Sequence, residues 1–190
     1  MLGPRPPPGT AVDGAGISGH SGRMTTAAAA RPSFESIDVA PNGPFPGSPH
    51  AARVYRAVLG AAHAMASERA AAFEALFARH GWPPAWRAGL YEVHHYHSSA
   101  HEVLGIFSGW VRARLGGPGG AVVTLREGDV VLIPAGVAHC NEGQSPDFRA
   151  VGAYPRGARP NMRYGRETER AADALRVAEL APPTPDPVFG

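Results

Sequence analysis

Residues 91–109 read YEVHHYHSSAHEVLGIFSG and place four histidines and a glutamate within nine residues, ahead of an apolar run. A second stretch, residues 128–141, reads GDVVLIPAGVAHCN and carries one more histidine after a P-x-G turn. Short apolar runs bounded by glycine and proline are typical of β-strands. We therefore expect the two stretches to lie in one β-structure and to contribute side chains to one site.

Further short apolar runs alternate with Gly/Pro turns along the middle of the chain. Six of them predict strands, over residues 90–97, 102–108, 110–115, 121–126, 129–133 and 148–154. Residues 52–58 predict an earlier strand. Six closely spaced strands indicate an all-β barrel or sandwich. The glycine cluster Gly116–Gly120 lacks the lysine and the following helix of a phosphate-binding loop, so we interpret it as a hairpin turn.

Helices are expected on both sides of this β-region. Residues 67–80 have apolar side chains at helical spacing and are followed by Gly81 and two prolines. A second helix is predicted over residues 167–180, with Ala171, Leu175 and Ala178 as the face that covers a sheet. Two prolines follow it.

The N-terminal residues 1–33 are rich in Pro, Gly, Ala and Ser without periodicity, which predicts disorder. Met24 lies inside this tail and is an alternative start. Residues 34–49 are turn-rich and predict an extended surface arm. The folded domain is expected over residues 34–190, with its β-core at about 85–155.

Composition argues against several classes of protein. The chain has eighteen arginines, no lysine and 16 acidic residues, which gives a net charge of +2. The basic residues form no continuous block, so no nucleic-acid partner is expected. The arginines near the C-terminus (156, 159, 163, 166, 170) are interpreted as a solvated face. The single cysteine, Cys140, excludes an intramolecular disulfide and fits a reducing cytoplasm. No apolar run approaches membrane-spanning length, so no membrane association is expected.

Strand geometry divides the histidines of residues 91–109 into two groups. Residues i and i+2 of a strand point to the same face, about 6–7 Å apart. His95 and His97 therefore project together, away from His94 and Tyr96. Glu102 shares parity with the apolar Leu104 and Ile106 and is expected to face inward.

These side chains form a plausible set of metal ligands. With His139 from the second stretch, three imidazoles and one carboxylate suit Fe, Mn, Co, Ni or Zn and leave positions for water or substrate. His101 is the rival to Glu102 as a ligand, although its parity points outward. His94 is expected to be packed or surface-exposed.

The spacings also resemble those of a known superfamily. H-x-H-x4-E-x6-G, ending at Gly109, and G-x5-P-x-G-x2-H, ending at His139, are similar to the paired motifs of cupins. A longer match over roughly residues 54–157 resembles the YjlB-like small bacterial cupins. The resemblance implies a single jelly-roll barrel (double-stranded β-helix) and a metal bound by His95, His97, Glu102 and His139. The family's asparagine follows this histidine by four residues, whereas here Asn141 follows it by two.

Two functions are compatible with such a site. The first is a metal-dependent enzyme acting on a small organic molecule, with oxygenase chemistry ahead of isomerase or lyase chemistry and with Glu102 also serving as a base. The second is a non-catalytic metal- or ligand-binding cupin, such as a sensor or accessory protein. A homodimer is expected because an exposed jelly-roll edge needs covering. The apolar walls of the site are predicted to be Val93, Leu104, Ile106, Val131 and Ile133.

Overall fold

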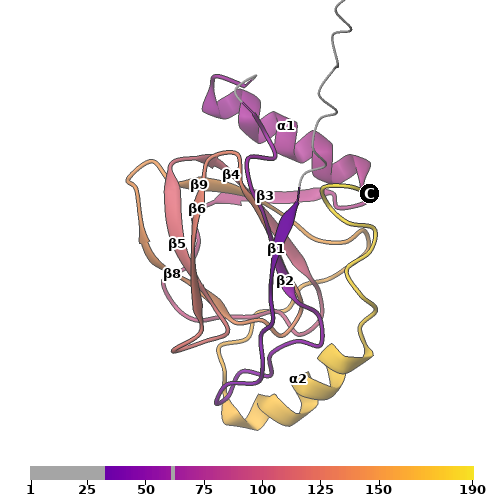
Figure 1. Cartoon of the computed structure of the whole chain (residues 1–190). Helices are drawn as coiled ribbons and strands as arrows, with labels where there is room; N and C mark the ends of the chain where they lie inside the picture. Colours follow the sequence, from indigo (N-terminus) through magenta and orange to yellow (C-terminus); the bar gives the residue numbers. More distant parts are fainter. Residues whose placement is uncertain (1–32, 61–62) are drawn as a thin grey trace, which may run out of the picture. The chain divides into compact units, whose positions relative to one another are not determined.

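The computed structural model describes residues 33–60 and 63–190, which form two antiparallel sheets and two helices (Figure 1). The predicted tail over 1–33, apart from Ser33, lies outside the described residues, as does the alternative start at Met24. The two helices lie at opposite ends of the β-structure in Figure 1.

The larger sheet has six strands in the order β1-β2-β7-β4-β9-β3. These strands are β1 (Phe34–Ile37), β2 (Ala52–Tyr55), β3 (Pro84–Ala88), β4 (Glu102–Ser108), β7 (Val130–Ile133) and β9 (Arg149–Ala153). In its centre β4 pairs with β7 on one side and with β9 on the other. The first residue of β4, Glu102, lies opposite Ile133, the last residue of β7.

The smaller sheet has three strands in the order β6-β5-β8. They are β5 (Trp110–Leu115), β6 (Ala121–Arg126) and β8 (His139–Gln144). Leu115 pairs with Ala121 across the glycine cluster, which confirms the predicted hairpin turn. Val111, Ala113 and Leu115 are buried, whereas Arg112 and Arg114 point outward.

One apolar core is built from strands of both sheets. It includes four of the five predicted wall residues, Leu104, Ile106, Val131 and Ile133, all of which are buried. The fifth, Val93, is 63% exposed, so its assignment to the wall was wrong. The parity that placed Glu102 on the same face as Leu104 and Ile106 is confirmed, since Glu102 is buried as well.

A second apolar layer covers the other face of the larger sheet. Helix α1 (Ala66–Arg79) contributes Phe73 and Phe77, which pack with Val103, Leu132 and other residues of the central strands. The central strands are consequently buried on both faces, which explains their continuous apolar sequence. Val188, near the C-terminus, packs into this layer, and Asp186 accepts hydrogen bonds from Tyr55 and Arg53.

Helix α2 (Glu167–Glu179) differs from the prediction in the face that it buries. Leu175, which was expected to cover a sheet, is 69% exposed. The buried residues of α2 are instead Asp173 and Val177. The helix is thus oriented by a buried carboxylate, which an apolar pattern cannot reveal.

The expected strand over residues 90–97 is absent from the described structure. His95 pairs with His139, but the next residue, Tyr96, pairs with Arg163 of a different segment. Because neighbouring residues pair with different segments, no ladder forms. Strands β1, β3 and β8 were not predicted, and the strand over 52–58 ends at Tyr55.

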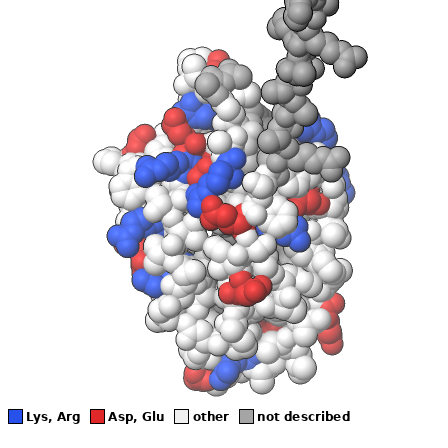
Figure 2. Space-filling model, viewed as in Figure 1, with Lys and Arg blue, Asp and Glu red and all other residues white. Residues whose placement is uncertain are grey.

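Acidic and basic side chains lie close together on the surface. Figure 2 shows arginines beside carboxylates on the face that it presents, and pairs such as Arg56–Glu35 and Arg69–Glu127 link them. Isolated pairs of this kind contribute about 0–1 kcal/mol each. Neither helix in the described part of the chain has the length and apolar composition needed to cross a membrane.

The contact between α1 and β4 generates a first prediction. A Cβ at Gly105 would lie 2.6 Å from Cγ of the buried Phe73, so a methyl group there must displace the ring. Gly105→Ala is expected to lower the free energy of unfolding by about 1–3 kcal/mol in urea denaturation. Gly60→Ala is the matched control, because its Cβ would meet nothing within 4 Å. Equal stability of the two variants would show that α1 packs more loosely than described.

Candidate metal centre

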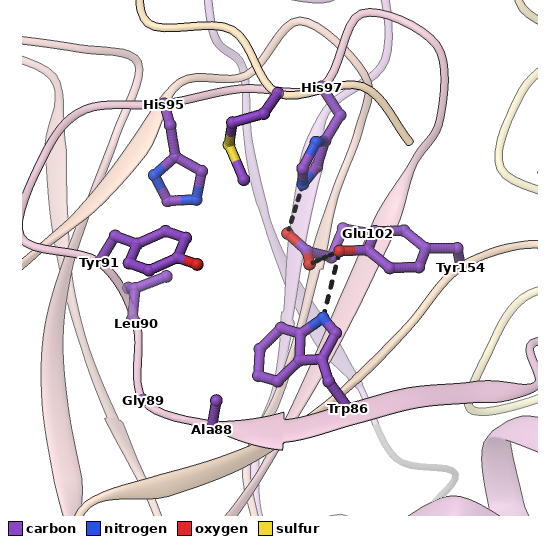
Figure 3. A pocket seen from close by; sticks show the side chains of 10 residues that line it. Trp86, Ala88, Gly89, Leu90, Tyr91, His95, His97, Glu102 and Tyr154 are labelled. Carbon is purple, nitrogen blue, oxygen red and sulfur yellow. Dashed lines mark hydrogen bonds and ion pairs between the residues drawn. The ribbon is translucent and has the colours of Figure 1, made fainter. Parts of the chain in front are cut away.

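The structure brings three of the four expected ligands together and places the fourth, His95, beside them. One ligand atom each of His97, Glu102 and His139 lies within 4.8 Å of the others, and all three residues are buried. His95 lies beside this group, with its ring centroid 4.2 Å from that of His139. Figure 3 shows His95, His97 and Glu102 around one cavity.

Backbone hydrogen bonds hold the two sequence motifs against each other. The N–H of His95 donates to the carbonyl of His139 (3.1 Å), and the N–H of His139 donates to the carbonyl of His95 (2.8 Å). Gly136 donates its N–H to the carbonyl of His97 (2.8 Å). Gly136 has a φ of +87°, and an added Cβ would clash with the carbonyl oxygen of Gly47, so only glycine fits this turn.

The three imidazoles are oriented in the same way. Nδ1 of His95 donates to the carbonyl of Val93 (3.0 Å), and Nδ1 of His139 donates to the carbonyl of Val137 (3.0 Å). Nδ1 of His97 donates to the carbonyl of Asn161. Each bond keeps a proton on Nδ1, so that in the neutral ring Nε2 carries the lone pair, which is how metal-binding histidines are held.

The buried nitrogen of His139 provides a test of whether a metal suits these residues. Its Nε2 has no hydrogen-bond partner within the described part of the chain, although burying an unpaired polar atom is unfavourable. It lies 3.3 Å from Oε2 of Glu102, and Nε2 of His97 lies 3.5 Å from the same oxygen. A cation bound between these atoms would satisfy all of them, so the residues fit a divalent transition metal.

Glu102 is held on its other side by a chain of hydrogen bonds. The hydroxyl of Tyr154 donates to Oε1 of Glu102 (2.7 Å). Nε1 of Trp86 donates to the Tyr154 hydroxyl oxygen (3.1 Å), as the dashed lines in Figure 3 show. The carboxylate therefore has one oxygen fixed by Tyr154 and the other directed at the histidines.

The charges of the site follow from burial and from this pairing. Burial, reinforced by the neighbouring His139, lowers the pKa of His95 to about 4, so its ring is neutral at pH 7. Burial opposes ionisation of Glu102, but the adjacent His139 and His97 hold the pKa of this carboxyl well below its usual range. Burial also disfavours charge on His97, yet Glu102 outweighs it and raises the pKa of that ring. Glu102 is consequently an anion, as a metal ligand must be.

The remaining histidines of the cluster do not join the site. His101 accepts a hydrogen bond from the N–H of Ala135 at Nδ1 (3.0 Å) and donates from Nε2 to the carbonyl of Ala181 (2.9 Å). Both of its ring nitrogens are occupied, so His101 cannot replace Glu102. His94 lies near Cys140, with 3.7 Å between Nε2 and Sγ, and does not line the cavity.

The cavity has a volume of about 360 Å³ and extends beyond the His/Glu cluster. Its apolar walls come from residues that the sequence did not single out, namely Trp86, Ala88, Leu90 and Met162. Tyr91, which is 59% exposed, also lines it. A metal at His95, His97 and Glu102 would be accessible to a small molecule from this space.

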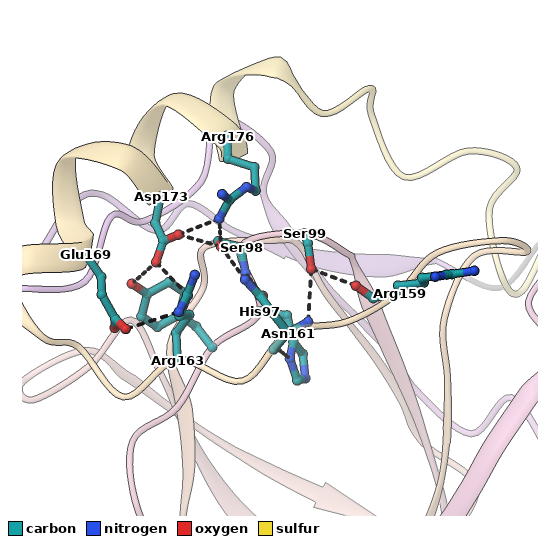
Figure 4. A network of polar contacts seen from close by, with 10 residues as sticks. His97, Ser98, Ser99, Arg159, Asn161, Arg163, Glu169, Asp173 and Arg176 are labelled. Carbon is teal, nitrogen blue, oxygen red and sulfur yellow. Dashed lines mark hydrogen bonds and ion pairs between the residues drawn. The ribbon is translucent and has the colours of Figure 1, made fainter.

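A polar network on α2 holds the segment that carries His97 (Figure 4). The buried Asp173 accepts hydrogen bonds from Tyr96 (2.8 Å) and from Ser98 (2.7 Å), the two neighbours of His97 in the sequence. Arg176 donates to the same carboxylate (2.8 Å). His97, which lies in no strand, is thus fixed through the residues on either side of it.

Asn161 connects this network to the His97 ring. Its side chain accepts a hydrogen bond from the N–H of Ser98 and donates one to the Ser98 hydroxyl, both at 2.9 Å. The backbone carbonyl of Asn161 accepts a hydrogen bond from Nδ1 of His97. Asp173 on α2 therefore positions the ring of His97 through Ser98 and Asn161.

The sequence analysis missed three residues that support the site, namely Tyr154, Asn161 and Asp173. Tyr154 shares parity with the buried Phe148 and Ala150, so alternation along the predicted strand 148–154 could have placed it inward beside Glu102. Asn161 lies in an irregular segment, and nothing in its sequence context identifies it. The buried Asp173 stands out only as an acid between alanines on a helix.

The α2 network generates a prediction about metal affinity. Asp173→Asn is expected to weaken metal binding about tenfold, because groups that orient a ligand typically contribute 10–100-fold. The measurement is competition with a coloured chelator, together with the visible spectrum of the Co²⁺-loaded protein, which reports ligand geometry. Ser98→Ala, which removes a single link, is expected to act in the same direction.

Asp186→Asn is the matched control for Asp173→Asn. Asp186 also accepts hydrogen bonds from a tyrosine and an arginine, but it holds the C-terminal segment and does not line the cavity. It should lower the melting temperature and leave the metal affinity and the Co²⁺ spectrum unchanged. Unchanged affinity and spectrum in both Asp173→Asn and Ser98→Ala would show that α2 does not position His97.

Comparison with known proteins supports part of the resemblance. No protein-family model matches the chain. The chain is 39% identical over 117 residues to the protein described as "Uncharacterized protein YjlB" from Bacillus subtilis (strain 168), a match that covers 62% of this chain and 71% of the relative. On this identity and coverage, the chain belongs to the YjlB family.

Proposed function

We propose that the protein is a cupin that binds one divalent transition metal through His95, His97, Glu102 and His139 and acts as a metal-dependent enzyme on a small organic molecule. One observation carries the proposal. Three imidazoles have Nδ1 held by a backbone carbonyl, and Nε2 of His97 and Nε2 of His139 lie 3.5 Å and 3.3 Å from a buried carboxylate at the end of a cavity of about 360 Å³. The proposal includes the jelly-roll barrel, which the shared core of the two sheets supports.

The chain's own residues would bind the metal, orient its ligands and shield the site from bulk water. A metal bound here would supply polarisation of an oxygen-containing substrate or, for a redox-active ion, oxygenase chemistry. Tyr154 keeps one oxygen of Glu102 occupied and so limits how the carboxylate can turn. Oxygenase chemistry is favoured over isomerase or lyase chemistry. Isomerases and lyases that move a proton require a proton acceptor, and Glu102, the carboxylate that lines the cavity, is a weak one because its pKa is lowered.

The non-catalytic alternative is compatible with the state of Glu102. Its pKa lies well below the usual range, and its carboxylate is engaged by Tyr154 and by the histidines. Such a carboxylate is a weak proton acceptor, so its role as a base remains a prediction and its role as a ligand is better supported. A binding protein would need only the ligand role. The homodimer, the cytoplasmic location and the lack of a nucleic-acid partner also remain predictions.

Metal content tests the proposed site. The purified protein is expected to contain about one equivalent of metal after reconstitution with Fe²⁺, Mn²⁺ or Co²⁺, measured by elemental analysis after gel filtration. Alanine at His97, Glu102 or His139 should lower the affinity by at least about tenfold, and His95→Ala should lower it as well. His94→Ala and His101→Ala are the controls and should keep the metal, although His101→Ala should lose stability because it leaves the Ala135 N–H unpaired.

Turnover separates the enzyme from the binding protein. The Fe²⁺-loaded protein, supplied with small diketones, catechols and hydroxy acids in an oxygen electrode, is expected to consume O2 with at least one of them. A protein that binds metal and ligand but consumes no O2 and forms no product with any compound would support the non-catalytic function. Full metal content in both His95→Ala and His139→Ala would show that the ligand assignment is wrong.

A further inference from the structure

The cavity beside the metal cluster has a strongly uneven distribution of polar atoms. One end carries His95, His97, Glu102 and the Tyr154 hydroxyl. Tyr91 lies beside this end, with its ring centroid 5.2 Å from that of His95, and Met162 follows Asn161, which contacts His97. The Trp86 indole, Ala88, Gly89 and Leu90 line the rest of the cavity with mainly hydrocarbon and aromatic surface (Figure 3). A ligand that fills the cavity must therefore place its polar groups at one end and an apolar body at the other.

The polar hydrogens of Trp86 and Tyr154 are already used, and the further hydroxyl, that of Tyr91, belongs to a ring that packs against His95. Nε1–H of Trp86 donates to Tyr154, and the Tyr154 hydroxyl donates to Glu102. None of the described residues that line the cavity is an arginine or a lysine. Arg163, from the basic run near the C-terminus, instead pairs with Glu169 and Asp173. A charged group far from the histidines would lose its hydration without gaining a partner, which is strongly unfavourable.

We propose that the cavity selects a compact ligand with an apolar ring or short chain and with its oxygen atoms at one end only. The oxygen atoms face His95, His97 and Glu102, and the apolar body lies against Trp86 and Leu90. Ligands with a phosphate, sulfonate or carboxylate at the far end are excluded. The inference rests on the proposed function, because the metal anchors the oxygen atoms. A volume of about 360 Å³ limits the ligand to roughly the size of one or two rings.

A pair of probes that differ only at the far end tests this selectivity. Catechol has two neighbouring oxygens on an apolar ring, and 4-sulfocatechol adds a fixed negative charge on the side away from them. Both are titrated without oxygen into the Co²⁺-loaded protein, with the visible Co²⁺ spectrum as the readout and the metal content checked afterwards. Catechol is expected to bind at least about tenfold more tightly than 4-sulfocatechol.

Ala88→Arg places a cation on the apolar wall. Ala88 is exposed and lines the cavity, so a guanidinium there can remain hydrated in the free protein. The variant is expected to shift the preference toward 4-sulfocatechol by about tenfold or more, whereas the control Ala88→Leu should keep the wild-type preference. Gly89→Arg is the second charged variant, since Gly89 is exposed and also lines the cavity.

The outcomes separate this inference from the proposed function. Failure of the wild type to bind Co²⁺, measured before any catechol is added, would overturn the metal site and with it the inference. A wild type that binds Co²⁺ but prefers 4-sulfocatechol, or that binds neither probe, would overturn only the ligand class. Unchanged selectivity in both charged variants would show that the probes do not enter the cavity.

Discussion

The site depends on a pair of backbone hydrogen bonds between His95 and His139. These bonds join two segments that are 44 residues apart (139 minus 95) and bring their side chains within contact of one another. Because the bonds involve only the main chain, both imidazoles remain available, and each ring is oriented by the carbonyl two residues before it. Glu102 reaches the same place because β4 begins opposite the end of β7, just before the turn that leads to His139.

The large sheet can support this arrangement because it is buried on both faces. The side chains of Leu104 and Ile106 fill the core shared with the smaller sheet, whereas Val103 faces α1. Glu102 lies on the same face of β4 as Leu104 and Ile106, because every second residue of a strand points to the same side, and its carboxylate is therefore buried. Burying a charged group is unfavourable unless it is paired, and Tyr154 and His97 provide partners for Glu102.

The residues of the His/Glu cluster and most of the central strands could be predicted from the sequence because both follow local rules. Alternation places Leu104, Ile106 and Glu102 on one face, and P-x-G before His139 predicts the turn. The same rules failed where the chain changes partners at every residue, as between His95 and Tyr96. They also failed for α2, since the side chain that orients it is Asp173, and its partners Tyr96 and Ser98 are more than 70 residues away. Such long-range polar contacts carry no periodic signal.

The Nδ1 hydrogen bonds to carbonyl oxygens have a consequence for how a metal would be acquired. Zinc fingers and similar small domains fold only around their ion, so folding itself selects for the metal. Here the rings are oriented by the chain, and the apolar core does not involve the ligands. Metal capture would then be a loading step on a finished fold, and the proposed donor set of three nitrogens and one oxygen would accept several divalent ions. The ions that the cell keeps available when the protein is made would decide which metal is bound, so metal found after overproduction would reflect the growth medium as much as the site.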